Sequence, residues 1–411
     1  MNRNYLFYMG ILFSSLDSFP LFINISTYAP YFSVLFFCVY LFLHHSKNDS
    51  SFSKKEFLYF LIITFSYLFS FFMGTLVYDD IDGFLKFSVQ LTIAVLLYKS
   101  FNCYFKKLPP KEYVQIFSRK FIVYTIPVLI IGIIEILLIN KAKIYSSLVS
   151  FFSWRVTPER IQLISGEPSW GARLLLVLLA IIPLTGYNKS RQNLLTIISL
   201  ILLFYTGSSL GILCMIIYYS VVYFRYKYIK YILLFSSVFI FSAPIVYNSL
   251  NDYTKNRLEA LSQLKENNLE TLAVEAGSGS IMARLGNPII GLYVGIDNPI
   301  TGVGGGYYYK YHYEYLTKYF PNALSIKNIY ETGVTTKNLF SRIFAEMGIL
   351  GFITLLWPLV WLLKNVIYKD RRMLGIYVCM ILLTLNFDTL FHIYPLILFC
   401  FLLNYPQRQI I

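Results

Sequence analysis

The chain has 411 residues, of which 57% are hydrophobic and 14% are charged, and its mean hydropathy is +0.59. A soluble domain carries about a quarter charged residues, so this composition excludes an ordinary soluble protein and indicates an integral membrane protein. The formal net charge of +14 would also suit a nucleic-acid-binding protein. We interpret it as the basic cytoplasmic lining of membrane spans, and we expect no nucleic-acid partner.

Apolar runs along the chain predict an all-α polytopic membrane protein with about twelve transmembrane helices. The first run is expected to be an uncleaved span. The expected spans are 5–25, 28–44, 57–77, 83–99, 120–140, 168–186, 192–206, 209–224, 230–249, 338–363, 373–390 and 392–405. They divide the chain into helices 1–9 (1–249), a large extracytoplasmic loop (250–337) and helices 10–12 (338–411).

Lysine and arginine are concentrated in connections that fall on one side of this arrangement. These connections are 44–56, 99–120, 187–191, 225–230 and 364–372. Because short cytoplasmic loops are enriched in Lys and Arg, both termini are expected in the cytoplasm. The basic side chains also suit anionic lipid head groups, so membrane lipids are expected partners.

Two segments are expected outside the bilayer core on the far side. Segment 141–167 contains Trp154 and Arg155, which suit head-group depth. The second segment, 250–337, is long enough to be either functional or disordered, and its tyrosine content argues against disorder.

Polar or glycine-rich patches all face the extracytoplasmic side in this topology. Their convergence predicts one site, roofed by the long loop. The patches are GEPSWGAR (166–173), TGSSLG (206–211), SIMARLG (280–286), TGVGGGYYYKYH (301–312) and TTKNLFSRIFAEMG (335–348).

Glu167 and Arg173 lie at the mouth of the span that begins near Pro168. Glu167 is either a carboxylate at a helix entrance or a general base that binds an acceptor hydroxyl. Arg173 lies about 9 Å below the interface by helical rise. It is expected either to face a cavity or to extend its head group back to the surface.

Arg284 and the glycines of the long loop are candidates for binding an anion. Arginine binds phosphate through a planar fork, so Arg284 and Arg173 could neutralise a diphosphate leaving group; a solvated loop charge is the alternative for Arg284. Gly302, Gly304 and Gly306 could cradle an anion or let a glycan pass, or they could form a plain loop hinge.

His312 could be a general base near neutral pH or a surface histidine. The tyrosines around it suit either sugar stacking or an aromatic belt at the bilayer surface. Asp388 and His392 could pair with each other near the end of a span. The five cysteines show no metal-ligand spacing, and we expect neither a disulfide framework nor a metal.

GEPSWGA resembles the Glu-Pro-Ser motif of bacterial O-antigen polymerases, the Wzy-type oligosaccharide repeat unit polymerases. The second half resembles the related O-antigen ligases, with their arginine, P-x-x-G-x-G-x-G segment, His-Asn pair and Glu-x-Gly-x-x-Gly segment. The matching positions are Arg284, Pro299, Gly302, Gly304, Gly306, Lys337, Asn338, Glu346, Gly348 and Gly351.

The resemblance implies a metal-independent, GT-C-like glycosyltransferase without a cofactor, in the bacterial inner membrane. Its donor and acceptor would be oligosaccharides linked to undecaprenyl diphosphate, joined at the periplasmic face, with a chain-length regulator protein as a conceivable partner. Glu167, Arg284, His312 and Lys337 are the candidate catalytic residues. Candidate substrate-binding residues are Arg173, Gly302, Gly304, Gly306, Asn338 and Arg155.

Two departures from the ligase pattern favour a polymerase over a ligase. Lys337 stands where the ligases carry their catalytic histidine, and Ser208-Ser209 stands where they carry Ser-Arg. A lysine could act as a base only with a lowered pKa, so Glu167, His312 and Lys337 all remain candidates for that role. A ligase-type glycan transferase and a lipid-linked oligosaccharide flippase are the alternative functions.

Overall fold

The computed structural model describes a chain in which every regular element is a helix. The described residues are 4–15, 32–44, 54–77, 81–110, 112–139, 141–152, 156–157, 160–223, 282–325, 335–368, 370–386 and 392–405. Within these ranges the all-α prediction is confirmed. The ninth predicted span, 230–249, lies outside the described residues, and the number of twelve spans stays a prediction.

The helices of the first part of the chain overlap the predicted spans, except that α6 lies in the segment 141–167, for which no span was predicted, and α1 ends earlier than expected. They are α1 (Asn4–Phe13), α2 (Phe32–His44), α3 (Lys54–Val77), α4 (Asp82–Lys107), α5 (Tyr113–Leu138), α6 (Ala142–Phe152), α7 (Pro168–Ile181), α8 (Lys189–Tyr205) and α9 (Ser209–Tyr223). The second part contains a π-helical turn (Met282–Gly286), α14 (Asn287–Asp297), α15 (Tyr308–Tyr319), α17 (Leu339–Leu362), α18 (Leu374–Thr384) and α19 (Ile393–Asn404).

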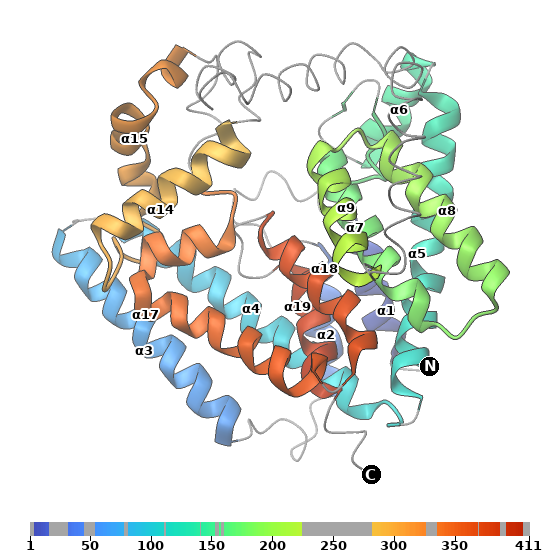
Figure 1. The fold of residues 1–411 in the computed structure, drawn as a ribbon, viewed down its shortest axis with the longest axis horizontal. Coiled ribbons are helices and arrows are strands. Elements are labelled where there is room, and N and C mark those ends of the chain that lie inside the picture. The colour runs from blue at the N-terminus through green and yellow to red at the C-terminus, as the bar shows by residue number, and fades with distance from the viewer. Residues whose placement is uncertain are drawn as a thin grey trace.

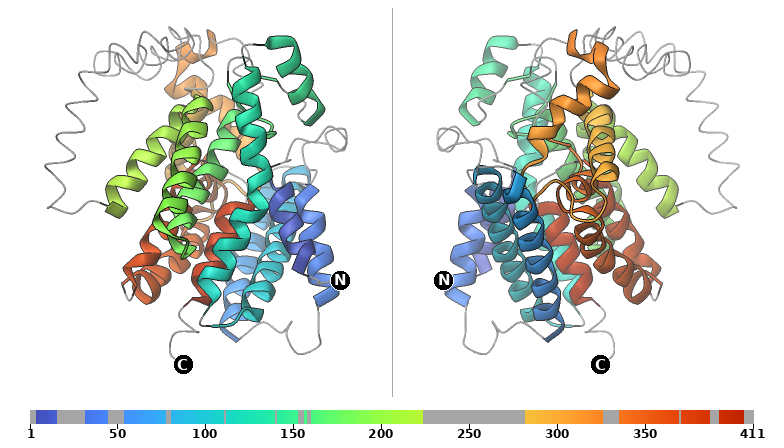
Figure 2. Two further views of the ribbon diagram at one scale, coloured as in Figure 1. Left: turned by 90° about the vertical axis from the view of Figure 1, so that its right-hand side faces the viewer. Right: turned by 90° about the vertical axis from the view of Figure 1, so that its left-hand side faces the viewer.

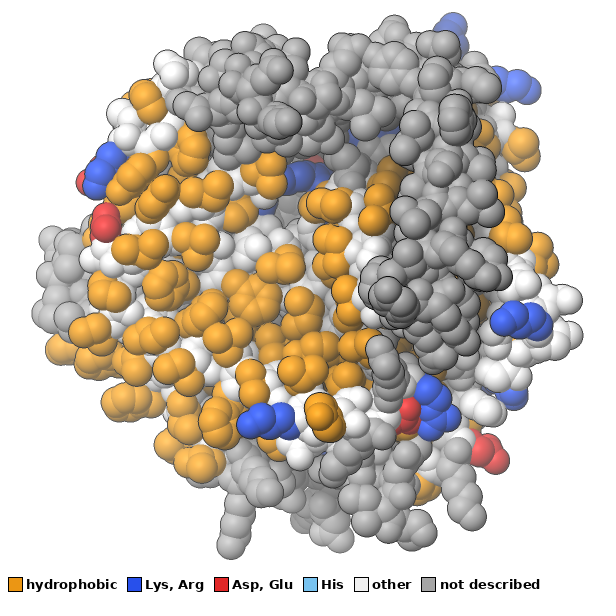
Figure 3. Space-filling view, viewed as in Figure 1, with side chains coloured by type: hydrophobic (Ala, Val, Ile, Leu, Met, Phe, Trp, Pro, Cys, Tyr) orange, Lys and Arg blue, Asp and Glu red, His pale blue; other side chains and the backbone are white. Residues whose placement is uncertain are grey.

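Among the described residues, three helical stretches are long and apolar enough to cross a membrane: Gly83–Lys107, Tyr113–Leu138 and Leu339–Ile367. Their outward side chains are apolar, as in Leu137, which is 71% exposed, and Trp357, which is 67% exposed. Figure 3 shows a broad hydrophobic face of this kind. Since an exposed apolar face of this extent is unfavourable in water, the protein is a helical membrane protein.

The described helices form two groups, which face each other across α18 and α19 (Figure 1). On one side α17 packs against α3 and α14. On the other side α7 packs against α8 and α9, and α18 contacts both α7 and α9. The start of α1 and the end of α19 lie toward the same end of the molecule, opposite α6 and α15 (Figure 2).

The part of the expected long loop that the structure describes is mostly helical and packs into the protein. Helix α14 lies along α17 because Gly291 and Gly295, four residues apart, leave a groove on one face. A Cβ at Gly295 would lie 2.4 Å from the ring of Phe344. A small-residue face of this kind allows two helices to approach closely, so α14 is a packed helix and not an open loop segment.

Helix α17 is kinked at Gly348, whose backbone has φ 60° and ψ −156°. The glycine-rich stretch that precedes α15 fills this kink. The N–H of Val303 donates to Ala345 O at 2.9 Å, and the N–H of Gly304 donates to Glu346 O at 3.0 Å. The kink therefore exposes backbone carbonyl groups of α17, and the glycine-rich stretch satisfies them.

Candidate functional site

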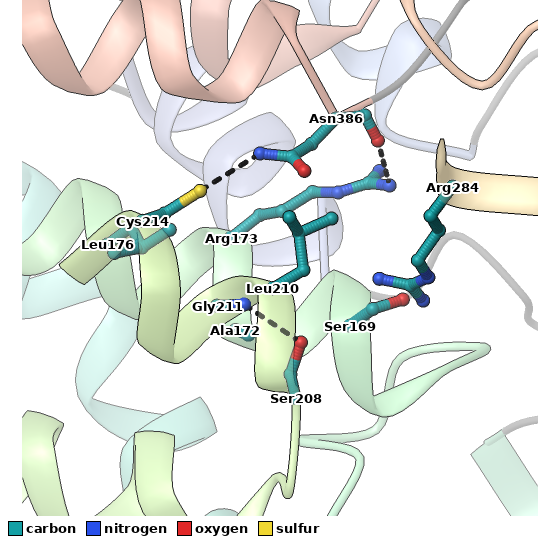
Figure 4. Close-up of a pocket in the computed structure, with 10 residues that line it drawn as sticks. All are labelled: Ser169, Ala172, Arg173, Leu176, Ser208, Leu210, Gly211, Cys214, Arg284 and Asn386. Carbon is teal, nitrogen blue, oxygen red and sulfur yellow. Dashed lines mark hydrogen bonds between the residues drawn. The ribbon is translucent and has the colours of Figure 1, made fainter. Parts of the chain in front are cut away.

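One pocket brings together three of the polar patches singled out in the sequence. It lies between α7, α9, the end of α18 and the π-helical turn, and Figure 4 shows its side chains. Its lining residues are Ser169, Ala172, Arg173, Leu176, Ser208, Leu210, Gly211, Cys214, Arg284 and Asn386. Of the five patches expected to share one site, 166–173, 206–211 and 280–286 contribute lining residues, whereas 301–312 and 335–348 contribute none.

Arg173 reaches across this pocket from the second turn of α7. The Nη1 atom of its guanidinium lies 3.1 Å from Nε2 of His392, and its Nη2 donates to Asn386 O at 2.9 Å. The side-chain amide of Asn386 in turn lies 3.1 Å from Sγ of Cys214. The guanidinium is therefore held at the end of α18, and the first of the two expectations for Arg173, a cavity-facing arginine, is the one observed.

Arg284 enters the same pocket from the π-helical turn, and its guanidinium points toward Ser169 (Figure 4). The ten lining residues include two arginines and no carboxylate. A pocket with two guanidinium groups and no acidic lining residue is complementary to a multiply charged anion. Figure 3 shows basic side chains, with a small acidic area beside them, in the recess between the two helix groups, next to a largely apolar face.

Glu167 stands at the entrance of α7, next to the pocket. Its backbone is extended, with φ −148° and ψ 148°, and Pro168 follows at the first helical position. Its side chain makes no capping hydrogen bond to α7, so the carboxylate does not serve as a side-chain cap. Instead, Ser169 Oγ donates to Glu167 Oε2 at 3.2 Å, and Ser169 itself lines the pocket.

The loop that carries Glu167 is fixed by Glu135, a residue that the sequence analysis missed. Glu135 lies in the last turns of α5 and is fully buried. Its carboxylate accepts the backbone N–H groups of Gln162, Leu163 and Ile164 at 2.6, 3.1 and 3.0 Å. Leu163 and Ile164 both have positive φ, 53° and 56°, which aims successive N–H groups at one carboxylate.

Arg160 joins the same loop to the turn that leads into α9. Its Nε donates to Thr206 O at 2.8 Å and its Nη2 donates to Gly207 O at 3.0 Å. The backbone N–H of Ile161 also donates to Tyr205 O at 3.2 Å. The 166–173 and 206–211 patches are therefore held together behind the pocket as well as within it.

His312 is buried in the structure and is not a surface residue. Its Nε2 lies 3.1 Å from Oδ1 of Asn287, the first residue of α14. Burial lowers the pKa of His312 to about 4, so the imidazole is neutral near pH 7. It does not line the pocket.

The candidate glycines pack closely against α17, α3 and α4 and do not line the pocket. A Cβ on Gly302 would lie 2.3 Å from the backbone carbon of Glu346, and one on Gly306 would lie 2.0 Å from Gly83 O. Gly304 packs against α3, where its Cβ would lie 3.0 Å from the Cα of Gly74. This close backbone packing indicates a structural role for the glycine-rich stretch.

Lys337 and Asn338 lie at the start of α17. Lys337 is exposed and has a left-handed backbone, with φ 54°. Asn338 caps α17 by accepting the N–H of Ser341 at 3.1 Å, and its Nδ2 donates to Leu385 O at 3.1 Å. Leu385 precedes Asn386, which holds Arg173, so Asn338 supports the pocket from outside.

Arg155, Trp154 and Asp388 lie outside the described residues. The predicted pair of Asp388 and His392 is therefore untested, whereas His392 contacts Arg173. Within the described ranges, no three His, Cys, Asp or Glu side chains lie together in a way that could hold a metal ion.

A second buried network lies beside the glycine-rich stretch. Arg342 and Glu346 form an ion pair of 3.1 Å one turn apart on α17, and Arg342 Nη1 donates to Gln90 Oε1 at 2.8 Å. The i, i+4 spacing of these charges within an apolar run was a signal that could have revealed the pair.

Comparison with known proteins gives one family match. Residues 194–356 match the O-antigen ligase family, and no curated protein matches the chain. The matched region includes most of α8, α9, Arg284, the glycine-rich stretch and most of α17, whereas Glu167 and Arg173 precede it. The chain is thus a helical membrane protein whose residues 194–356 are similar to the O-antigen ligase family.

Proposed function

We propose that this protein polymerises oligosaccharide repeat units carried on undecaprenyl diphosphate, at the periplasmic face of the bacterial inner membrane. The observation that carries the proposal is the pocket in which Arg173 and Arg284 converge, with Glu167 one hydrogen bond away through Ser169. The growing chain is moved from its lipid diphosphate to a hydroxyl of the next lipid-linked unit.

In this reaction the acceptor hydroxyl oxygen forms a bond to the anomeric carbon of the donor sugar. The bond between that carbon and the diphosphate oxygen breaks, and its electron pair leaves with the lipid diphosphate. The hydroxyl proton passes to the Glu167 carboxylate. Glu167 is the preferred base because it is linked to a pocket residue, whereas His312 contacts α14 and Lys337 is exposed outside the pocket.

Arg173 and Arg284 act on the leaving group. Negative charge develops on the bridging diphosphate oxygen as the bond breaks, and preorganised donors stabilise it without reorganisation. Removal of one such donor typically lowers turnover by about 10²–10³-fold. The bonds from Arg173 to Asn386 and His392 supply the preorganisation.

The location of the first and last described helices supports the proposed topology. The start of α1 and the end of α19 lie toward the same end of the molecule (Figure 2), and Arg119, Arg191 and Arg372 lie within the first two turns of α5, α8 and the 3-10 helix Arg371–Met373. Both termini are proposed to be cytoplasmic. A chain-length regulator is a further proposed partner.

The test is chain growth in vitro. Purified protein is mixed with synthetic undecaprenyl-diphosphate-linked repeat units, and the products are resolved by length. A ladder is expected, and Glu167→Gln should abolish it while the protein still binds donor. Glu314→Gln, at an exposed position of α15, is the matched control.

The same purified protein also distinguishes a polymerase from the two alternatives, a ligase and a flippase. Transfer to a lipid A–core acceptor without a ladder would establish a ligase. Movement of intact lipid-linked units across vesicle membranes, with no new glycosidic bond, would establish a flippase. Either result would overturn the polymerase proposal.

A further inference from the structure

His312 and Asn287 form a buried contact between α15 and the first turn of α14. His312 Nε2 lies 3.1 Å from Asn287 Oδ1, and the Asn287 side chain donates from Nδ2 to Thr335 O at 3.1 Å. Since the amide nitrogen faces Thr335, the amide oxygen faces His312. A carbonyl oxygen only accepts, so Nε2 of His312 carries the proton of this hydrogen bond.

Asn287 also fixes the segment that carries Arg284. The π-helical turn Met282–Gly286 runs directly into α14, so Arg284 precedes Asn287 by three residues on one continuous backbone. Asn287 is 2% exposed, and its carbonyl oxygen accepts the Tyr308 hydroxyl at 3.4 Å. α15 therefore holds the base of the Arg284 turn through two side chains, His312 and Tyr308.

The hydrogen bond from Asn287 Nδ2 to Thr335 O begins a connection toward Arg173. Thr335 belongs to the short segment that ends at Asn338, and Asn338 donates to Leu385 O at 3.1 Å. The next residue, Asn386, accepts from Arg173 at 2.9 Å. One connected path of hydrogen bonds and short backbone segments thus runs from His312 to Arg173, and Arg284 is attached to its middle.

We propose that His312 and Asn287 are positioning residues that set Arg284 against Arg173 for a bound diphosphate, with His312 acting as a hydrogen-bond donor and not as a general base. This inference rests on the proposed function of the pocket. A reacting or binding group displaced by about 1 Å can cost up to about 10²-fold, so the loss of this contact should be measurable without unfolding the protein.

Substitutions at positions 312 and 287 distinguish a hydrogen-bond donor at position 312 from a general base. Glutamine at position 312 can donate from its amide to Asn287 Oδ1 but cannot accept a proton. His312→Ala and Asn287→Ala should each weaken binding of inorganic pyrophosphate, measured by calorimetry, by about tenfold and raise KM for the donor. His312→Gln should stay within about twofold of the wild type in both. Tyr313→Ala, on the exposed neighbouring position, is the matched control.

A double variant tests whether His312 acts through Arg284. In an Arg284→Lys background, His312→Ala should weaken pyrophosphate binding no further, because the planar guanidinium group that His312 positions is already absent. Additive losses would overturn the proposal. So would a His312→Gln protein that binds pyrophosphate normally yet makes no polymer, since that result identifies His312 as a proton acceptor.

Failure of the proposed function would look different. If the wild-type protein makes no ladder but the pyrophosphate affinities follow the expected order, the polymerase assignment falls and the positioning role stands. If the wild type makes a ladder while His312→Ala and Asn287→Ala leave pyrophosphate affinity and KM unchanged, the positioning role falls and the polymerase stands.

Discussion

The carboxylate of Glu135 accepts the backbone N–H of Gln162 at 2.6 Å, which joins the end of α5 to the loop that carries Glu167. Two further N–H groups, from Leu163 and Ile164, converge on the same carboxylate. A fully buried acid with three backbone donors is an anchor, since breaking the arrangement leaves several buried polar groups without partners.

Glu135→Gln should therefore lower both stability and turnover. The amide group would direct a donor at backbone N–H groups, and hydrogen bonds to a charged group contribute about 1.5–3 kcal/mol each. We expect the free energy of unfolding to fall by about 2–4 kcal/mol, as measured by thermal unfolding in detergent. Glu112→Gln, at an exposed position just before α5, is the control and should change neither quantity. Wild-type stability in Glu135→Gln would show that the loop is held by other contacts.

Arg173→Lys should retain the positive charge of the pocket but lose its geometry. A lysine cannot bridge His392 and Asn386 O while also facing a ligand, because its single ammonium group lacks the planar fork. We expect the KM for lipid-linked donor to rise about tenfold, and Arg173→Ala to lower turnover by about 10²-fold or more. Equal kinetics for the lysine variant and the wild type would mean that the charge alone matters.

The sequence predicted the pocket better than it predicted the packing around it. Charged residues inside apolar runs are costly unless they share a cavity or a partner, and this reasoning brought Arg173, Arg284 and the 206–211 turn together correctly. It could not place Asn386 or His392, whose roles depend on where the end of α18 lies. Glu135 obeys the same rule as Arg173, but its partners are backbone groups, which no sequence pattern distinguishes.

The sequence analysis did not predict helix α14, for a related reason. Residues 287–297 contain Pro288, Gly291 and Gly295, which in isolation indicate a loop. Next to α17 the two glycines make a close helix–helix contact possible, and tertiary packing outweighs the low helix propensity of glycine. The glycine-rich stretch at 302–306 is the same kind of case, because its backbone conformation is needed for contact with the α17 kink.

Gly302→Ala distinguishes this packing role from the anion cradle that the glycine pattern also allowed. Gly302 has φ +65°, and a Cβ there would lie 2.3 Å from the Glu346 backbone. We expect a loss of at least about 2 kcal/mol in stability, measured by thermal unfolding. Gly305→Ala should cost less, since its Cβ would meet the Tyr67 ring edge at 3.0 Å and its φ is not positive. A Gly302→Ala protein with normal stability and weakened pyrophosphate binding would instead support the cradle.

Glu346→Gln should be more damaging than removal of the whole ion pair. Arg342 and Glu346 are buried 3.1 Å apart, and removing one partner of such a pair leaves an uncompensated charge at a cost of about 3–5 kcal/mol. The double variant Arg342→Met/Glu346→Leu should recover part of that loss. The exposed Lys318–Asp297 pair, at 3.9 Å, is the control, because Asp297→Asn should change stability by less than about 1 kcal/mol.

Stability should depend on pH through His312. Its pKa in the folded protein is lowered to about 4 by burial, whereas an unfolded histidine titrates near 6.5. Between these values the unfolded chain binds more protons than the folded one, so acid favours unfolding. The contribution of neutral His312 is complete above about pH 6.5, falls as the pH drops toward 4 and changes no further below that value. Thermal unfolding at pH 7 and pH 4.5 should show a smaller acid-induced decrease for His312→Gln than for the wild type. Identical decreases in the two proteins would mean that His312 is already protonated, or accessible to protons, in the folded state.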